Sequence, residues 1–296
     1  MANQTSEREE REQEEESVTD AKRLSSKLIY EVIRRDGEDE LRRPMRSLLW
    51  SGIAAGMMIS FSVLGEAILR VYLPKAGWAH LVESLGYSIG FLLVILGRMQ
   101  LFTENTITTV LPVVGKPCRK NLIRVARLWS LVLAANILGV FLAASFIAFT
   151  PAFEPQVVAA VAELSRQATG HGLVEGFFRA MPAGVLVASI VWMLPTTEAG
   201  KFSVILLFTW LIAAGNFTHV IAGSVEMAFL VVTAELPLGP AFRGFFLPVL
   251  LGNVVGGTMV FTMLAWGQVK SEVDNSDTVG RSAGNLLQDK GSAAAL

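Results

Sequence analysis

The chain has 296 residues, of which 52% are hydrophobic and only 17% are charged, and its mean hydropathy is +0.49. A soluble protein of this size carries roughly 25% charged residues, whereas the stretch 46–267 holds only 22 charges in 222 positions. A soluble domain is therefore excluded for most of the chain, and the formal net charge of −1 gives no reason to expect binding to nucleic acid. The composition predicts a membrane domain over residues 46–269 with polar segments on both sides.

The N-terminal polar segment divides into two parts. Residues 1–23 are mostly Glu and Arg with almost no apolar side chain, which is typical of a disordered tail. In residues 24–45 apolar residues recur at helical spacing, at Leu24, Leu28, Ile29, Val32 and Ile33. This pattern predicts an amphipathic helix and a linker on the cytoplasmic surface. Both anchoring and gating of a pore mouth are compatible with such a helix.

Uncharged runs predict the membrane spans, because a helix needs about 20 apolar residues to cross the hydrocarbon core. Four runs are long enough to be whole spans: 47–65, 128–153, 180–197 and 244–269. The stretches 83–115 and 202–234 have 33 residues each and are interrupted by polar residues. A straight helix of that length would reach about 50 Å, which is too long for one untilted crossing. We therefore expect six spans, of which the second and the fifth are each broken into two half-helices.

The distribution of basic residues predicts the orientation. Lys and Arg are concentrated before the first span, between the second and third, between the fourth and fifth, and after the sixth. By the positive-inside rule these connections face the cytoplasm, so both termini are expected there. Residues 270–296 are then a polar cytoplasmic tail, and its end, 291–296, has the composition of an expression-vector scar.

Two short motifs occur twice in the chain. Asn136-Ile-Leu-Gly139 matches Asn253-Val-Val-Gly256 with an offset of 117 residues, and Phe102-Thr103 matches Phe217-Thr218 with an offset of 115. Two halves with three spans each must have opposite topologies in the membrane. The sequence therefore predicts an inverted 3+3 repeat whose pseudo-twofold axis lies in the membrane plane.

The two interruptions, 98–106 and 215–222, are expected to be non-helical and to meet near the membrane centre. Unpaired backbone groups are tolerated there only where they face protein or a water-filled path, so the polar residues mark a substrate path. His219 is the only histidine inside a predicted span. Because imidazole ordinarily titrates near neutral pH, His219 suits a proton donor or pH sensor. His80 and His171 lie outside the predicted spans and are expected to have no chemical role.

Three ionisable residues fall at membrane depth, namely Arg98, Glu104 and Glu226. An unpaired arginine at that depth would cost several kcal/mol, so Arg98 is expected to pair with one of the two carboxylates. One interpretation is a charge network that fixes the irregular backbone. The other is a carboxylate that lines the pore, repels anions and favours cations or neutral solutes.

These motifs resemble the formate/nitrite transporter family, in its YfdC-like branch, over about residues 28–269. The resemblance is carried by the string from Arg98 to Thr106, by the string from His219 to Glu226, and by the repeated motifs around Asn136 and Asn253. It implies a homopentamer of all-α, aquaporin-like hourglass subunits in a bacterial inner membrane, each with its own pore. It implies no enzyme activity, no cofactor and no metal.

The resemblance also implies roles for individual residues. His219 corresponds to the central histidine and Thr103 to its partner across the pore, with Thr218 and Asn216 expected beside them in the second interruption. Constrictions are expected at Tyr87, Phe91, Leu101 and Ile212.

Three hypotheses for function follow. The leading one is a channel or transporter for a small monovalent weak-acid anion, such as formate, nitrite or hydrosulfide, with His219 as the central proton donor. The alternative is a pore for a small neutral or cationic solute, with selectivity set by Glu104 and Glu226. The third is a non-conducting membrane scaffold that presents its charged N-terminal tail to a partner.

Overall fold

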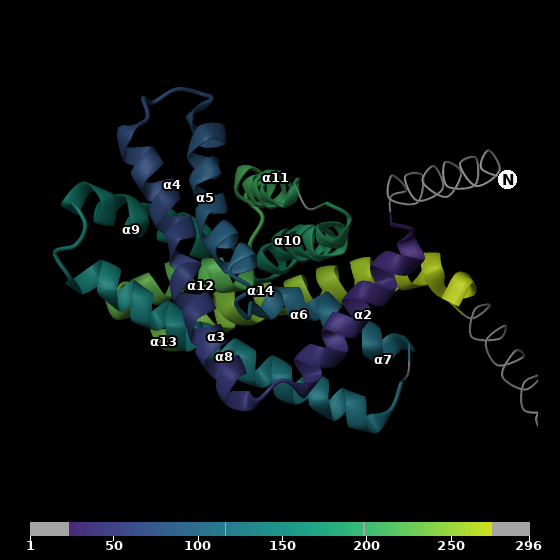
Figure 1. Ribbon diagram of the computed structural model, residues 1–296. Coiled ribbons are helices and arrows are strands. Elements are labelled where there is room, and N and C mark those ends of the chain that lie inside the picture. Colours follow the sequence, from purple (N-terminus) through teal and green to yellow (C-terminus); the bar gives the residue numbers. More distant parts are fainter. Residues whose placement is uncertain (1–23, 116, 198, 274–296) are drawn as a thin grey trace, which may run out of the picture.

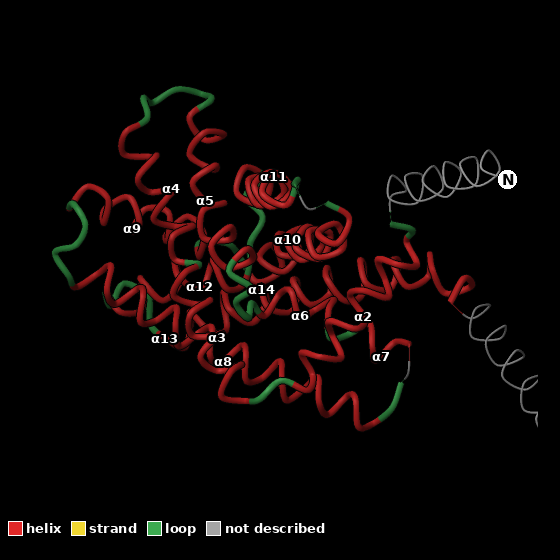
Figure 2. The backbone as a smooth tube through the Cα atoms, in the orientation of Figure 1, coloured by secondary structure: helices red, strands yellow, loops and turns green. Residues whose placement is uncertain are grey.

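The computed structural model describes residues 24–115, 117–197 and 199–273. The tail expected at 1–23, most of the tail expected at 270–296, and the segment 291–296 lie outside these described residues. Within them all regular structure is helical (Figure 2), in agreement with the predicted all-α class.

The helices follow one another with short connections. In chain order they are α2 (Ser26–Arg42), α3 (Met45–Met58), α4 (Ser60–Tyr72), α5 (Ala79–Leu96), α6 (Phe102–Thr108), α7 (Leu111–Gly115), α8 (Arg119–Phe149), α9 (Pro155–Thr169), α10 (Leu173–Met193) with the 3-10 turn η1 (Leu194–Thr196), α11 (Lys201–Ala214), α12 (Val220–Val232), α13 (Leu238–Pro240), the π-helical segment η2 (Ala241–Phe246), α14 (Leu247–Val254) and the π-helical segment η3 (Val255–Thr262).

Five helices of the described chain are long and apolar enough to cross a membrane. They are Met45–Tyr72, Ala79–Leu96, Arg119–Phe149, Leu173–Thr196 and Leu238–Val273. The stretch expected to form the fifth span contains two shorter apolar helices instead, α11 and α12. The stretch expected to form the second span contains α5, which is by itself 18 residues long, followed by the short helices α6 and α7.

Close helix pairs build the body of the molecule. Helix α3 packs along α8, and α14 packs along α10. Both contacts need small residues: a Cβ added at Gly56 would collide with the carbonyl oxygen of Asn136, and one at Gly184 with that of Asn253. Small residues let helix backbones approach closely inside a membrane, so the two halves of the chain use the same packing device.

Helices α6 and α12 lie near the middle of the molecule, among α3, α4, α8, α10 and α14 (Figure 1). The side chains of α12 from Val220 to Leu230 are all buried. A helix buried on all sides in this way belongs to the interior of the fold. The first residues of α6 and α12 are therefore held at the centre of the fold.

The N-terminal helix α2 lies against α6, α7 and α10. Its buried stripe consists of Ile29, Tyr30, Ile33, Gly37 and Leu41. Of the apolar residues that recur at helical spacing, Ile29 and Ile33 belong to this stripe, whereas Leu24, Leu28 and Val32 are exposed. Gly37 lies so close to the Thr108 carbonyl of α6 that a Cβ there would collide with it.

Candidate functional site

His219 and Thr103 meet at the centre of the fold. Both side chains are almost completely buried, and His219 Nε2 lies 2.6 Å from Thr103 Oγ1. The other ring nitrogen, Nδ1, accepts a hydrogen bond from the backbone N–H of Ala222 at 3.2 Å. Because a backbone amide can only donate, the neutral ring carries its hydrogen on Nε2 and donates it to Thr103. The hydroxyl hydrogen of Thr103 then remains available to a solute.

Two asparagines hold the backbone on either side of this pair. Asn136 Oδ1 accepts from the N–H of Phe102, and its Nδ2 donates to the carbonyls of Gly52 and Gln100, at distances of 2.8–2.9 Å. Asn253 does the same in the second half: it accepts from Val220 N–H at 2.7 Å and donates to the Ala180 and Thr218 carbonyls. Each asparagine therefore satisfies two backbone groups of an interruption and joins them to a carbonyl of a neighbouring helix, Gly52 of α3 or Ala180 of α10.

The two interruptions end their preceding helices in the same way. Arg98 and Asn216 adopt left-handed backbone conformations, with φ values of 51° and 49°. The N–H of the next residue then donates a hydrogen bond to a carbonyl five residues earlier: Met99 N–H donates to the Val94 carbonyl, and Phe217 N–H to the Ile212 carbonyl. Such a left-handed residue is a common end of an α-helix. Residue Arg98 thus terminates α5 and exposes its side chain.

The non-helical stretches are shorter than the sequence indicated. Only residues 97–101 and 215–219 separate the helices, since α6 begins at Phe102 and α12 at Val220. The expectation of non-helical backbone at 102–106 and 220–222 was therefore wrong. The asparagine side chains provide the physical reason, because they satisfy the first N–H groups and let each helix start at once.

Apolar side chains surround the His219–Thr103 pair. Phe91 packs edge-on against the imidazole with ring centroids 4.9 Å apart, and Tyr87 packs on Phe91 at 5.4 Å. Leu101 and Ile212, the other two expected constriction residues, are also buried. The residues expected to form constrictions therefore lie around or near the pair, and the arrangement leaves a bare charge with little solvation at this point.

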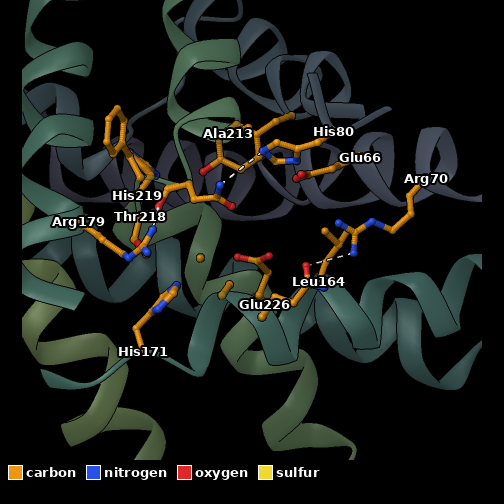
Figure 3. Close-up of a pocket in the computed structure, with 16 residues that line it drawn as sticks. Glu66, Arg70, His80, Leu164, His171, Arg179, Ala213, Thr218, His219 and Glu226 are labelled. Carbon is orange, nitrogen blue, oxygen red and sulfur yellow. Dashed lines mark hydrogen bonds between the residues drawn. The ribbon is translucent and has the colours of Figure 1, made fainter. Parts of the chain in front are cut away.

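Two cavities approach this centre. The first has a volume of about 470 Å³ and is called the Glu226 cavity here; its lining includes His219, Thr218 and Asn216 (Figure 3). The second, the Glu104 cavity, has a volume of about 530 Å³, and its lining includes Leu101 and four carboxylates, Asp36, Asp39, Glu40 and Glu104. No described residue lines both cavities. His219 therefore lines one polar cavity, and Leu101, two residues before Thr103, lines the other.

The expected charge network is not formed. Glu104 and Glu226 line different cavities, and in the described part of the chain Arg98 makes no ion pair with either of them. One oxygen of Glu104 is buried without a hydrogen-bond partner. Arg98 lines the Glu104 cavity and has an exposed side chain. Its guanidinium is therefore not desolvated, and the cost of an unpaired buried arginine, on which the expected ion pair was based, does not arise.

Several cavity residues were not expected from the sequence. Arg70 pairs with Glu83 at 2.9 Å, and Arg179 donates to the backbone oxygen of Asn216 at 3.2 Å. His80, expected to have no chemical role, lines the Glu226 cavity. Glu66 also faces this cavity. A usable signal existed for Glu66 and Arg179, because these charged residues directly flank the uncharged runs 47–65 and 180–197.

Comparison with known proteins gives a consistent result. The profile described as formate/nitrite transporter matches residues 27–267. The inner membrane protein YfdC of Escherichia coli (strain K12) is 41% identical over 271 residues, which cover 91% of this chain and 87% of that protein. The formate channel FocA of Haemophilus influenzae is 26% identical over 244 residues, covering 74% of this chain and 84% of FocA.

Solved structures agree on the fold. A structure titled pentameric formate channel with formate bound superposes with a TM-score of 0.63 at 22% identity, covering 75% of this chain and 96% of that one. A structure titled FNT family ion channel superposes with a TM-score of 0.70 at 19% identity, covering 81% and 98%. At these identities the likeness is evidence for a shared architecture.

Proposed function

Because the chain belongs to the formate/nitrite transporter family and is a multi-pass membrane protein, we propose that it conducts a small monovalent weak-acid anion of the formate, nitrite or hydrosulfide type. The observation that carries this proposal is the His219–Thr103 hydrogen bond between two cavities. A solute that passes from one cavity to the other meets this pair within an apolar surround. A neutral species crosses such a surround far more easily than an ion does.

His219 is the proposed proton donor. In the neutral ring Nε2 carries the only N–H, so the ring can give up a proton only after Nδ1 has gained one. Protonation of Nδ1 breaks the hydrogen bond from Ala222 N–H. The imidazolium then passes its Nε2 proton to Thr103 Oγ1 while the Thr103 hydroxyl proton moves to the anion, which leaves a neutral acid, an intact hydroxyl and a neutral ring. Thr218 and Asn216, which line the Glu226 cavity, are proposed to guide the solute towards the pair.

The architecture of the proposal is an inverted repeat of six spans, in which α11 and α12 together form one crossing. The matching asparagines, Asn136 and Asn253, and the matching left-handed residues, Arg98 and Asn216, support it. A homopentamer in a bacterial inner membrane with both termini in the cytoplasm is proposed from the named relatives and from the basic connections. On this orientation the Glu104 cavity faces the cytoplasm.

The His219→Phe variant tests the mechanism. We expect it to assemble, because Phe fills a similar apolar space, and to lose the dependence of flux between about pH 5 and 7 that a titrating imidazole confers. The measurement is stopped-flow uptake into proteoliposomes for formate, nitrite and hydrosulfide. An unchanged pH profile for the best substrate would exclude His219 as the donor. No flux of any solute through the wild-type protein would favour the scaffold hypothesis.

A second candidate function is conduction of a small neutral or cationic solute. The observation that favours it is the pair of carboxylates, Glu226 in one cavity and Glu104 in the other, neither of which is neutralised by an ion pair in the described residues. A negatively charged lining concentrates cations and repels anions. Ammonium and glycerol in the same uptake assay test this candidate: it requires faster flux for one of them than for formate, and slower ammonium flux in Glu104→Gln and Glu226→Gln.

A further inference from the structure

We propose that Glu66, Tyr87 and Glu226 form a binding site for a small monovalent cation in the Glu226 cavity. All three side chains line this cavity, and they come from three different helices, α4, α5 and α12. Tyr87 also packs on Phe91, which contacts His219. The site therefore lies beside the aromatic side chains that lead to the centre of the fold.

The three side chains are buried but have no partner. They are 8%, 6% and 9% exposed in the order Glu66, Tyr87 and Glu226. Among the described residues none of their side-chain oxygens makes a hydrogen bond or an ion pair, and Figure 3 shows the Glu226 carboxylate pointing into the cavity, between Arg179 and His171 on one side and Arg70 on the other. Buried polar groups normally have partners, so these oxygens are placed to receive one that the chain itself does not provide.

The cationic side chains nearby are already engaged. Arg70 is 2.9 Å from Glu83 and 3.5 Å from Glu163, and Arg179 is 2.7 Å from Glu175. Glu66 and Glu226 line the same cavity. In the described residues neither arginine makes an ion pair with Glu66 or Glu226, so a diffusible cation can supply a positive charge directly to these carboxylates.

The geometry favours a monovalent ion. Carboxylate and phenol oxygens accept hydrogen bonds from ammonium and also coordinate alkali ions. The described residues contain no group of three or more His, Cys, Asp or Glu side chains placed to hold a metal ion, whereas a dehydrated divalent ion needs several strong oxygen ligands. The site does not depend on which solute crosses the pore: a bound cation would reduce the repulsion of an anion on its way to His219, and it would be the first binding step for a cationic solute.

Equilibrium binding tests the proposal separately from transport. The full-length protein in lipid nanodiscs is heated at pH 7.5 and at pH 8.5 in choline chloride, and choline is replaced stepwise by ammonium, potassium, sodium or, in a separate series, magnesium at constant ionic strength. We expect a saturable rise of the unfolding midpoint by about 2–4 °C with ammonium or an alkali ion, because a ligand that binds only the folded state stabilises it. Comparing these ions identifies which type binds.

Variants locate the site. Glu66→Gln and Glu226→Gln should each abolish the saturable rise, and Tyr87→Phe should raise the half-saturating concentration several-fold. The matched control is Glu154→Gln, which removes an exposed carboxylate beside Tyr72 and should leave the response unchanged. A rise that persists in both glutamine variants, a response to magnesium alone, or no cation-specific response at either pH would overturn the proposal.

A crystallographic measurement covers the case in which a variant does not assemble. Wild-type crystals are soaked in about 50 mM rubidium chloride, which is below physiological ionic strength. The anomalous difference map should then show a peak within about 3 Å of oxygens of both Glu66 and Glu226. Absence of a peak between these carboxylates would contradict the proposal. Neither result depends on flux, so failure of this site is distinguishable from failure of the weak-acid mechanism.

Discussion

At the scale of single residues, two asparagines, Asn136 and Asn253, hold the backbone on either side of the His219–Thr103 pair. Each satisfies one backbone N–H and two carbonyls with one buried side chain. These groups lie at membrane depth, where water is scarce and an unmade hydrogen bond costs about 1–3 kcal/mol. The positions of His219 and Thr103 therefore depend on residues that have no direct contact with a solute.

Replacement of Asn253 by Leu should destabilise the protein severely. Three polar groups, at Val220, Ala180 and Thr218, would lose their partner, for an expected loss of about 3–6 kcal/mol in the free energy of unfolding. Thermal unfolding in detergent or nanodiscs measures the effect. The control is Glu154→Gln, which changes an exposed side chain beside Tyr72; equal midpoints for the two variants would refute the capping role of Asn253.

At the scale of elements, helix α2 is held by a close backbone contact with α6 and is stabilised by ion pairs along its own length. A Cβ at Gly37 would collide with the Thr108 carbonyl oxygen, so the helix lies as near to α6 as its backbone allows. Along the same helix, Arg34 makes ion pairs with Glu31 and Glu38. Since Asp36, Asp39 and Glu40 line the Glu104 cavity, the position of α2 determines the charge at that cavity.

Gly37→Leu should displace α2 from α6. Leucine favours a helix more than glycine by nearly 1 kcal/mol, so the helix itself should persist while its docking is lost. Hydrogen–deuterium exchange should show faster exchange in residues 26–42 and at Thr108. Val32→Ala, which changes an exposed side chain of the same helix, should leave the exchange pattern unchanged. Unaltered protection in Gly37→Leu would contradict the docking contact.

The ion pairs of α2 should respond to acid. The hydrogen bond from Arg34 lowers the pKa of Glu31 from 4.5 to about 2, so the stabilisation is complete above about pH 4.5 and is lost as the pH falls towards 2. The pair is partly exposed, so its contribution is only a few tenths of a kcal/mol. Exchange within α2, corrected for intrinsic rates, should accelerate as the pH falls from 4.5 to about 2 in the wild type and much less in Glu31→Gln. Identical profiles would exclude the pair as a support of α2.

At the scale of the whole molecule, the chain repeats one structural plan. Helices α5 and α11 both end at a left-handed residue, and α6 and α12 both start under an asparagine side chain. The same plan places the two helix starts opposite each other, so that Thr103 and His219 form a hydrogen bond across 116 residues of sequence. One cavity is lined by His219, and a separate one is lined by Leu101 and Glu104 on either side of Thr103 in the chain.

Subunit assembly is the prediction that belongs to this scale. The superposed formate channel is titled pentameric, and this chain exposes many large apolar side chains, among them Leu138, Leu142 and Phe146 on α8. We expect native mass spectrometry from a mild detergent to show five copies of the 32.0 kDa chain. A stable species of any other copy number, in more than one detergent, would rule out the proposed homopentamer.

The sequence by itself determined the features that depend on local composition and repetition. The scarcity of charge from 46 to 267 required a membrane domain, and the strings at Arg98–Thr106 and His219–Glu226 indicated the family. The resemblance also implied that Thr103 is the partner of His219, and the two side chains lie 2.6 Å apart. These inferences succeed because hydrophobicity and short motifs are properties of neighbouring residues.

Only the tertiary structure decided where charges lie relative to one another. Arg98 was expected to need a partner because its depth was inferred from sequence position, whereas its side chain at the left-handed turn is exposed at the Glu104 cavity. Glu104 and Glu226 face different cavities, and Glu226 instead shares a cavity with Glu66 and Tyr87 from helices distant in sequence. The rotation of a helix about its axis and the identity of its neighbours depend on packing between distant segments, and a single sequence contains no direct measure of that packing.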